Sequence, residues 1–86
     1  MDRKIILSST ALEDLKFWSK NDPKTIQKIF KLISEIQNYP FEGTGKPEPL
    51  KHNLAGCWSR RIDEVNRLVY KVDEESIIIV SCKYHY

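Results

Sequence analysis

The sequence contains little that would place the chain in a metal-binding, disulfide-stabilised or membrane-spanning class. Its only two cysteines, Cys57 and Cys82, have neither the C-x-x-C spacing nor the histidine neighbours of a zinc site. We therefore predict two reduced core cysteines, no metal and no cofactor. No apolar run approaches the roughly 20 residues of a transmembrane helix, and the first residues lack the apolar stretch of a signal peptide. We expect a cytoplasmic protein with no membrane partner.

The net charge is also small, because a formal value of +2 does not by itself predict a nucleic-acid partner. The distribution of charge is more informative. Between residues 46 and 67 the acidic side chains are Glu48, Asp63 and Glu64. The basic ones are Lys46, Lys51, His52, Arg60, Arg61 and Arg67. This segment therefore predicts a local basic patch.

The amino-terminal part predicts one strand followed by two helices. The apolar run Lys4–Leu7 indicates the strand, and the Ser-Ser-Thr sequence after it indicates a helix N-cap. Apolar residues then recur every three to four positions to about Lys20, with Glu13 and Asp14 in the expected first turn. Pro23 starts a second helix. Its apolar stripe comprises Ile26, Ile29, Phe30, Ile33 and Ile36.

The remainder predicts a long loop and then strands. Residues 39–50 hold three prolines and two glycines, and loops of this length tend to be functional. The strands predicted after it are Leu50–Leu54, Cys57–Ile62, Arg67–Val72 and Ser76–Tyr84. We therefore predict a single α+β domain over residues 1–86. Its order is β-α-α-β-β-β(-β), with an antiparallel sheet covered on one face by the two helices.

Alternation along the predicted strands separates two faces of the sheet. The face expected beneath the helices comprises Trp58, Ile62, Leu68, Tyr70, Val72, Ile78, Val80, Cys82 and Tyr84. The opposite, open face comprises Ser59, Arg61, Arg67, Lys71, Ser81, Lys83 and His85. Arg60, Val69, Ile77 and Ile79 depart from the pattern. The open face is therefore polar and rich in cations.

This face and the loop carry the residue types that cleave RNA without a metal. The reaction needs a base for the 2′-OH proton, cations for the charge on phosphorus, and an acid for the leaving 5′-oxygen. Glu48 is a candidate base, and His85 is a candidate acid because imidazole can donate a proton near neutral pH. The candidate phosphate ligands are Arg61, Arg67 and Lys51. The same spacings also fit a solvated loop carboxylate and surface salt bridges.

Four segments resemble one known family. They are PFEGTGKPEPLKHNL at 40–54, WSRRI at 58–62, NRLVY at 66–70 and CKYHY at 82–86. With them the chain resembles the YoeB/Txe toxins of the RelE superfamily over its whole length. The resemblance implies a RelE-like microbial RNase fold. It also implies a ribosome-dependent mRNA interferase, which is the toxin of a type II toxin–antitoxin system and cleaves mRNA in the ribosomal A site.

The resemblance also implies the roles of individual residues. Glu48 matches the general base, His85 the general acid, and Arg67 the arginine that stabilises the scissile phosphate. Tyr86 matches a C-terminal tyrosine that helps to organise the site. The residues expected to contact RNA are Lys51, Arg61, Tyr86 and Lys46.

The partners implied are a cognate antitoxin of the Phd/YefM/Axe type, the ribosome and mRNA. Pairing with a second copy as a homodimer stays open beside them. Two alternatives stay open. One is a non-catalytic RNA-binding module, and the other is a protein-binding toxin of the gyrase-directed type on the same fold. Glu48, Arg67 and His85 together favour the enzyme, because the gyrase-directed relatives lack this acid–base set.

Overall fold

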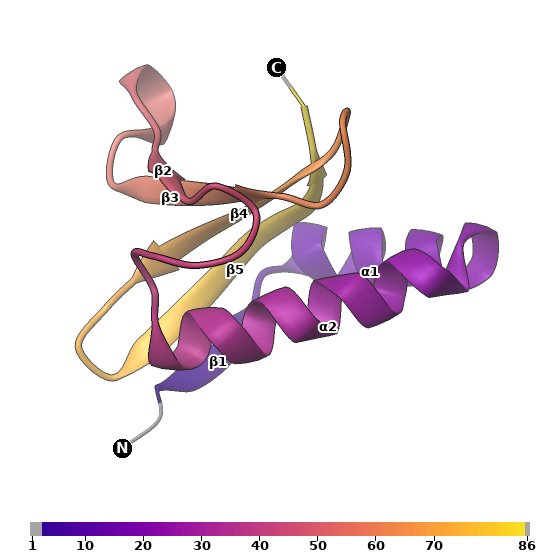
Figure 1. Cartoon of the computed structure of the whole chain (residues 1–86), viewed down its shortest axis with the longest axis horizontal. Coiled ribbons are helices and arrows are strands. Elements are labelled where there is room, and N and C mark those ends of the chain that lie inside the picture. The colour runs from indigo at the N-terminus through magenta and orange to yellow at the C-terminus, as the bar shows by residue number, and fades with distance from the viewer. Residues whose placement is uncertain (1–2, 86) are drawn as a thin grey trace.

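The computed structural model describes residues 3–85 and has two helices on one face of a five-stranded sheet (Figure 1). The elements in chain order are β1 (Lys4–Leu7), α1 (Ser9–Asn21), α2 (Pro23–Asn38), β2 (Glu48–Pro49), the 3₁₀ helix η1 (His52–Leu54), β3 (Cys57–Arg61), β4 (Arg67–Val72) and β5 (Ser76–Tyr84). The predicted α+β class is confirmed. Within the described residues, neither helix combines the length and apolar character of a membrane span.

Both helices begin where the sequence predicts. The Ser8 hydroxyl caps α1 by accepting a hydrogen bond from Ala11 N at 3.0 Å. Pro23 is the first residue of α2, where its missing N–H costs nothing. Since α1 begins at Ser9, Glu13 and Asp14 lie in its second turn, and the predicted place in the first turn is wrong.

The sheet is mixed, with strand order β1-β5-β4-β3-β2, so the prediction of a wholly antiparallel sheet is wrong at one edge. β1 pairs in parallel with β5, and Ile5 lies opposite Ile77. The other pairs are antiparallel. The short turns that join β3, β4 and β5 favour antiparallel pairing, whereas β1 and β5 are separated by most of the chain and can run in the same direction.

The strand predicted at Leu50–Leu54 is also wrong. The pairing with β3 is made earlier, by the two residues of β2, with Glu48 opposite Ser59. Pro49, which has no N–H to donate, is tolerated because β2 is an edge strand. The chain then forms η1, closed by a 3.1 Å hydrogen bond from Leu54 N to Lys51 O. Glu48 therefore lies on a strand beside β3 and not on a free loop.

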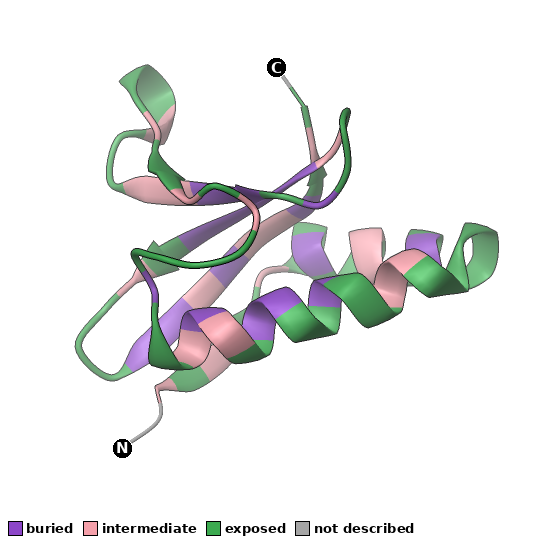
Figure 2. Ribbon diagram, in the orientation of Figure 1, coloured by how far each residue is buried: buried purple, intermediate pink, exposed green. Residues whose placement is uncertain are grey.

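The core fills the space between the helices and the sheet (Figure 2). From the helices it contains Ala11, Trp18, Ile29, Leu32, Ile33 and Ile36, and from the β3–β4 turn, β4 and β5 it contains Ile62, Leu68, Tyr70, Ile77, Ile79 and Cys82. Burying one such large apolar side chain contributes about 1.5–3 kcal/mol. Phe30 was predicted in the apolar stripe of α2 but is 50% exposed, and Leu32 is buried instead.

β5 does not alternate strictly, because it contains two bulges. Tyr70 pairs with Ile79, and Arg67 pairs with Tyr84. Arg67 and Tyr70 are three residues apart in β4, whereas Ile79 and Tyr84 are five residues apart in β5, so β5 has two extra residues. Each extra residue on one strand reverses which face the following residues occupy. The sequence pattern could not reveal this reversal, since every residue from Ile77 to Val80 is apolar.

The bulges correct the faces predicted for the middle of β5. Ile77 and Ile79, which departed from the predicted pattern, are fully buried in the core. Ile78 and Val80, which were predicted beneath the helices, are only half-buried and lie outside the core cluster.

The end of β5 is corrected for the same reason. Tyr84, predicted to face the core, is the register partner of Arg67, and directly opposed residues of an antiparallel pair share a face. Lys83 was predicted on the open face, but its Nζ atom lies 3.7 Å from the centre of the Phe17 ring of α1. The end of β5 is thus held against α1.

Both cysteines are free thiols, as predicted. Cys82 is fully buried, whereas Cys57 is only half-buried and is not part of the core. Burial, together with the nearby charge of Asp14, raises the pKa of the Cys82 thiol to about 12. The Cys82 side chain therefore stays protonated and behaves as a small apolar residue.

Candidate active site

Three neighbouring strands bring a carboxylate and two guanidinium groups together on the sheet face that the helices leave open. Glu48 in β2 lies opposite Ser59 in β3, and Arg61 in β3 lies directly opposite Arg67 in β4. Arg67 Nη2 is 3.1 Å from Glu48 Oε1, and Arg67 Nε donates to Ser59 Oγ at 2.9 Å. The register of β2, β3 and β4 therefore aligns these side chains.

The two members of the ion pair differ in exposure. The Arg67 side chain is 11% exposed and held by Ser59, whereas that of Glu48 is 50% exposed. Arg67 is thus held in place, whereas half of the Glu48 side chain is accessible to solvent. The same arginine lines a cavity of about 410 Å³ together with Arg61, Glu64 and Val65. That volume lies within the range of roughly 300–1,000 Å³ of ligand sites.

The two predicted lysines lie on either side of β2. Lys46 is two residues before Glu48, and Lys51 is at the N-cap of η1. Both are exposed, and neither side chain makes a hydrogen bond or ion pair with another residue between 3 and 85. Lys46 has a left-handed backbone, with φ of 52°. Both lysines are therefore close to Glu48 in the sequence, and neither is hydrogen-bonded or ion-paired to Glu48 or Arg67.

His85 lies at the end of the sheet that carries the two arginines. It follows Tyr84, the partner of Arg67, and it is exposed. The Cα atoms of His85 and Tyr84 are about 3.8 Å apart, and those of the paired residues Tyr84 and Arg67 are about 5 Å apart. The Cα atoms of His85 and Arg67 therefore lie within about 10 Å of each other. No side chain of residues 3–85 forms a hydrogen bond with the imidazole. The prediction for Tyr86 falls outside the described residues.

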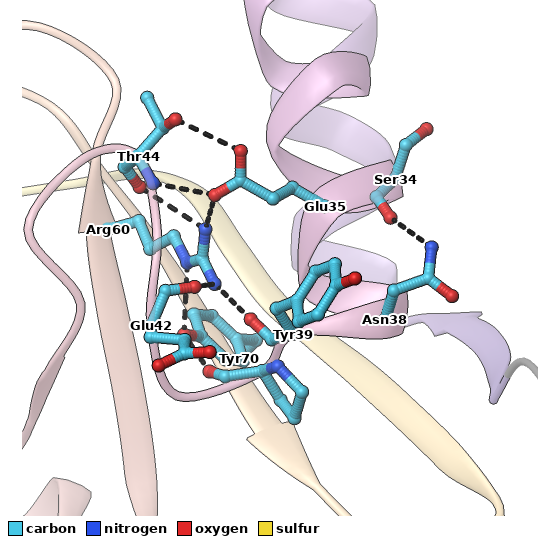
Figure 3. Close-up of polar contacts among 9 residues, drawn as sticks. Ser34, Glu35, Asn38, Tyr39, Glu42, Thr44, Arg60 and Tyr70 are labelled. Carbon is cyan, nitrogen blue, oxygen red and sulfur yellow. Dashed lines mark hydrogen bonds and ion pairs between the residues drawn. The ribbon is translucent and has the colours of Figure 1, made fainter.

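Arg60 is a structural residue whose role the sequence did not reveal. Its side chain is fully buried on the helix side of β3 and forms an ion pair with Glu35 of α2 (Figure 3). The guanidinium donates five hydrogen bonds, one for each of its N–H groups. The acceptors are Tyr70 Oη at 3.3 Å, Glu35 Oε1, Tyr39 O, Glu42 O at 2.8 Å and Thr44 O at 3.3 Å.

This cluster also holds the loop that leads to Glu48. The Glu35 carboxylate accepts hydrogen bonds from Thr44 N at 2.6 Å and Thr44 Oγ1 at 3.0 Å. Gly43 has φ of 126°, and a Cβ there would lie 2.0 Å from Glu35 Oε1, so the loop can close only on glycine. Gly45 O accepts from Arg61 N at 2.7 Å. The loop is thus fastened to α2 and β3.

A charged residue at an apolar-face position of a strand was the one signal that could have found this cluster. Arg60 lies two residues from both Trp58 and Ile62, so strand alternation places it on the same face as these apolar residues. A buried arginine requires a carboxylate partner. Its partner Glu35 lies in α2 and is half-buried against the loop. Alternation along the strand did not identify which acidic residue would be the partner of Arg60.

Acid should weaken the fold through Glu35. Its hydrogen bond from Thr44 N, followed by those from Thr44 Oγ1 and Arg60, holds the pKa of the carboxyl below its ordinary 4.5. The stabilisation is therefore present above about pH 4.5 and is lost as the pH falls through the lower, folded-state pKa. We expect urea unfolding at pH 7 and pH 3 to show a smaller acid-induced loss in Glu35→Gln than in wild type. An equal loss in the two proteins would contradict this assignment.

Comparisons with known proteins identify the family. A family model described as the YoeB-like toxin of bacterial type II toxin–antitoxin systems matches residues 7–86. Toxin YoeB of Escherichia coli K12 is 51% identical over 83 residues, which cover 96% of this chain and 99% of that protein. The YoeB dimer of Staphylococcus aureus is 49% identical over the full length of both chains, with a TM-score of 0.91. The corresponding values for a YoeB–YefM complex from the same species are 48% and 0.87. As its resemblance to the YoeB/Txe toxins predicted, the chain belongs to the YoeB-like toxin family of bacterial type II toxin–antitoxin systems, within the RelE superfamily.

Proposed function

We propose that this protein is a ribosome-dependent endoribonuclease that cleaves mRNA in the ribosomal A site and so inhibits translation. The observation that carries the proposal is the 3.1 Å pair between Arg67 Nη2 and Glu48 Oε1, with Arg61 directly across from Arg67. A half-exposed proton acceptor beside two guanidinium groups suits a phosphodiester. Membership of the toxin family supports the same reading.

In the proposed reaction, Glu48 accepts the proton of a ribose 2′-OH. The 2′-oxygen then attacks the adjacent phosphorus, and the P–O5′ bond breaks. His85 donates a proton to the departing 5′-oxygen. The products are a 2′,3′-cyclic phosphate and a 5′-hydroxyl, so no water and no metal is consumed in this step. The charge that develops on the phosphate oxygens is stabilised by Arg67.

The remaining cations would hold the RNA on either side of the scissile bond. We assign this role to Arg61, Lys51 and Lys46, which are exposed, and we assign to Tyr86 the role of contacting RNA and helping to organise the site. A phosphate bound between Arg61 and Arg67 would share the 410 Å³ cavity that both line. The ribosome supplies the rest of the rate enhancement by aligning the mRNA. Fixing two reacting groups in the right geometry can lower an activation barrier by up to roughly 7–11 kcal/mol.

We further propose that the protein acts in the cytoplasm and is neutralised by a cognate antitoxin of the Phd/YefM/Axe type. The support is the likeness to YoeB chains solved in complex with YefM. The likeness to a YoeB dimer supports a homodimer. Nothing in the proposed chemistry requires a cofactor.

The test adds purified protein to a translating extract and maps mRNA ends by primer extension. We expect new stops at A-site codons with the wild type and none with Glu48→Ala or His85→Ala. The released downstream fragments should be labelled by polynucleotide kinase without prior phosphatase treatment, because they carry a 5′-hydroxyl. Glu74→Ala is the control, since Glu74 is an exposed carboxylate in the β4–β5 turn at the other end of the sheet.

Two outcomes would overturn the proposal. Intact mRNA together with salt-sensitive binding to RNA would indicate a non-catalytic RNA-binding module. Arrested cells with intact mRNA and inhibited gyrase would indicate a protein-directed toxin on the same fold.

A further inference from the structure

The second bulge of β5 is held by two side chains of α1. The Asp14 carboxylate accepts a hydrogen bond from Cys82 N at 2.9 Å and another from Ser81 Oγ at 3.1 Å. The Trp18 indole donates from Nε1 to Cys82 O at 2.8 Å. A bulge leaves backbone groups without partners in the strand ladder, and buried ones need partners elsewhere. Here, one helix provides the partners for both backbone groups of Cys82.

The first bulge is held by the residue that caps the same helix. The Ser8 hydroxyl, which accepts the capping bond from Ala11 N, donates to Val80 O at 2.7 Å. Ser8 N also donates to Ile79 O at 3.0 Å. Every departure of β5 from regular pairing is thus tied to the segment that runs from Ser8 to Trp18.

These contacts determine where the last residues of β5 lie. The bulges change the register by two residues before the Arg67–Tyr84 pair, and His85 follows directly. Without them, Tyr84 would fall out of register with Arg67 and His85 would be displaced with it. Because no side chain of residues 3–85 binds the imidazole, its position depends on the backbone before it.

We propose that Asp14 and Trp18 are positioning residues for His85, acting through Cys82 and the second bulge of β5. This inference rests on the proposed nuclease function. Neither side chain touches the RNA or the reacting atoms: Trp18 is buried in the core, and Asp14 is bonded to the inner side of β5. Their effect on cleavage therefore passes through the proposed general acid.

The test is a double-mutant cycle between Asp14→Ala and His85→Ala, with A-site cleavage measured under single-turnover conditions. A displacement of about 1 Å in a catalytic group can cost on the order of 10²-fold. We expect Asp14→Ala to lower the cleavage rate substantially in the wild-type background and hardly at all in the His85→Ala background. Effects that act through one group are strongly non-additive.

Three variants make the cycle specific. Asp14→Asn is expected to retain most of the rate, because its carbonyl oxygen can replace the single carboxylate oxygen that accepts from both Cys82 N and Ser81 Oγ. Trp18→Phe removes the indole N–H and should behave like Asp14→Ala. Glu13→Ala is the matched control, since Glu13 lies in the same turn but is exposed and, among residues 3–85, forms an ion pair with Lys16 alone, at 3.5 Å.

A direct readout separates this inference from the proposed function. NMR should show faster amide exchange at Cys82 and Tyr84 and a shifted His85 ring resonance in Asp14→Ala, whether or not the protein cleaves RNA. An equal fold loss in both backgrounds, or an unchanged His85 resonance, would overturn the positioning role. A wild-type protein that leaves mRNA intact, while Asp14→Ala still moves the His85 resonance, would instead count against the nuclease and keep the structural coupling.

Discussion

Glu48→Gln is expected to slow mRNA cleavage by about 10²–10⁴-fold, the usual contribution of a positioned general base. Glutamine has the same shape and can still accept a hydrogen bond from Arg67, but it cannot take up the 2′-OH proton. Because Glu48 is half-exposed on an edge strand, the substitution should not unfold the protein. Single-turnover cleavage on stalled ribosomes measures the chemical step, and binding to those ribosomes should be unchanged.

The control for this prediction is Glu64→Gln. Glu64 is an exposed carboxylate that lines the same cavity as Arg61 and Arg67, but it has no ion pair with either arginine among the described residues. We expect the Glu64→Gln variant to cleave mRNA at close to the wild-type rate. If Glu64→Gln were slow and Glu48→Gln were fast, the base would be Glu64 and our assignment would be wrong.

Arg60→Met should destabilise the fold by about 3–5 kcal/mol, the cost of removing one partner from a buried ion pair. The substitution leaves Glu35 without its cation, and the carbonyl groups of Tyr39, Glu42 and Thr44 lose their donor. Domains are stable by only about 5–15 kcal/mol in total, so the variant would be close to unfolding. Urea titration of the free energy of unfolding at pH 7 measures the effect.

The neighbouring residue provides the matched comparison. Arg61 lies in the same strand but on the open face, and its side chain is exposed. Arg61→Met should change the free energy of unfolding by about 0–1 kcal/mol, as expected for exposed charges. Arg61→Met should instead lower the rate of RNA cleavage. Similar losses of stability in the two variants would show that the buried cluster contributes less than its five hydrogen bonds suggest.

Most of the secondary structure could be predicted because the signals are local. The N-cap at Ser8, the proline at Pro23 and the apolar spacing of both helices depend only on neighbours in the chain. The placement of Arg61 and Arg67 on one face also followed from alternation, because the pairing between β3 and β4 is regular and contains no bulge. Glu48 and His85 were candidates from their residue types and their positions on the loop and the open face, and the family resemblance then gave each a specific role.

The errors lie where a residue's environment depends on distant parts of the chain. The bulges of β5 are held by Ser8, Asp14 and Trp18, more than 60 residues away. Burial of Arg60 depends on Glu35 and on the loop that folds over it. The parallel pairing of β1 depends on which edge of the finished sheet remains open. Periodicity contains no information about such contacts.

By itself, the amino-acid sequence determined the helices, most strands, the α+β class, the family and the residues to test, because capping, proline geometry and side-chain alternation act over a few positions. Only the tertiary structure decided that Glu48 meets Arg67 at 3.1 Å, that Arg60 is buried while Arg61 is exposed, and how β5 approaches its end. The physical reason is that a buried charge or an unpaired backbone group is stable only beside a specific partner, and packing brings that partner from elsewhere in the chain.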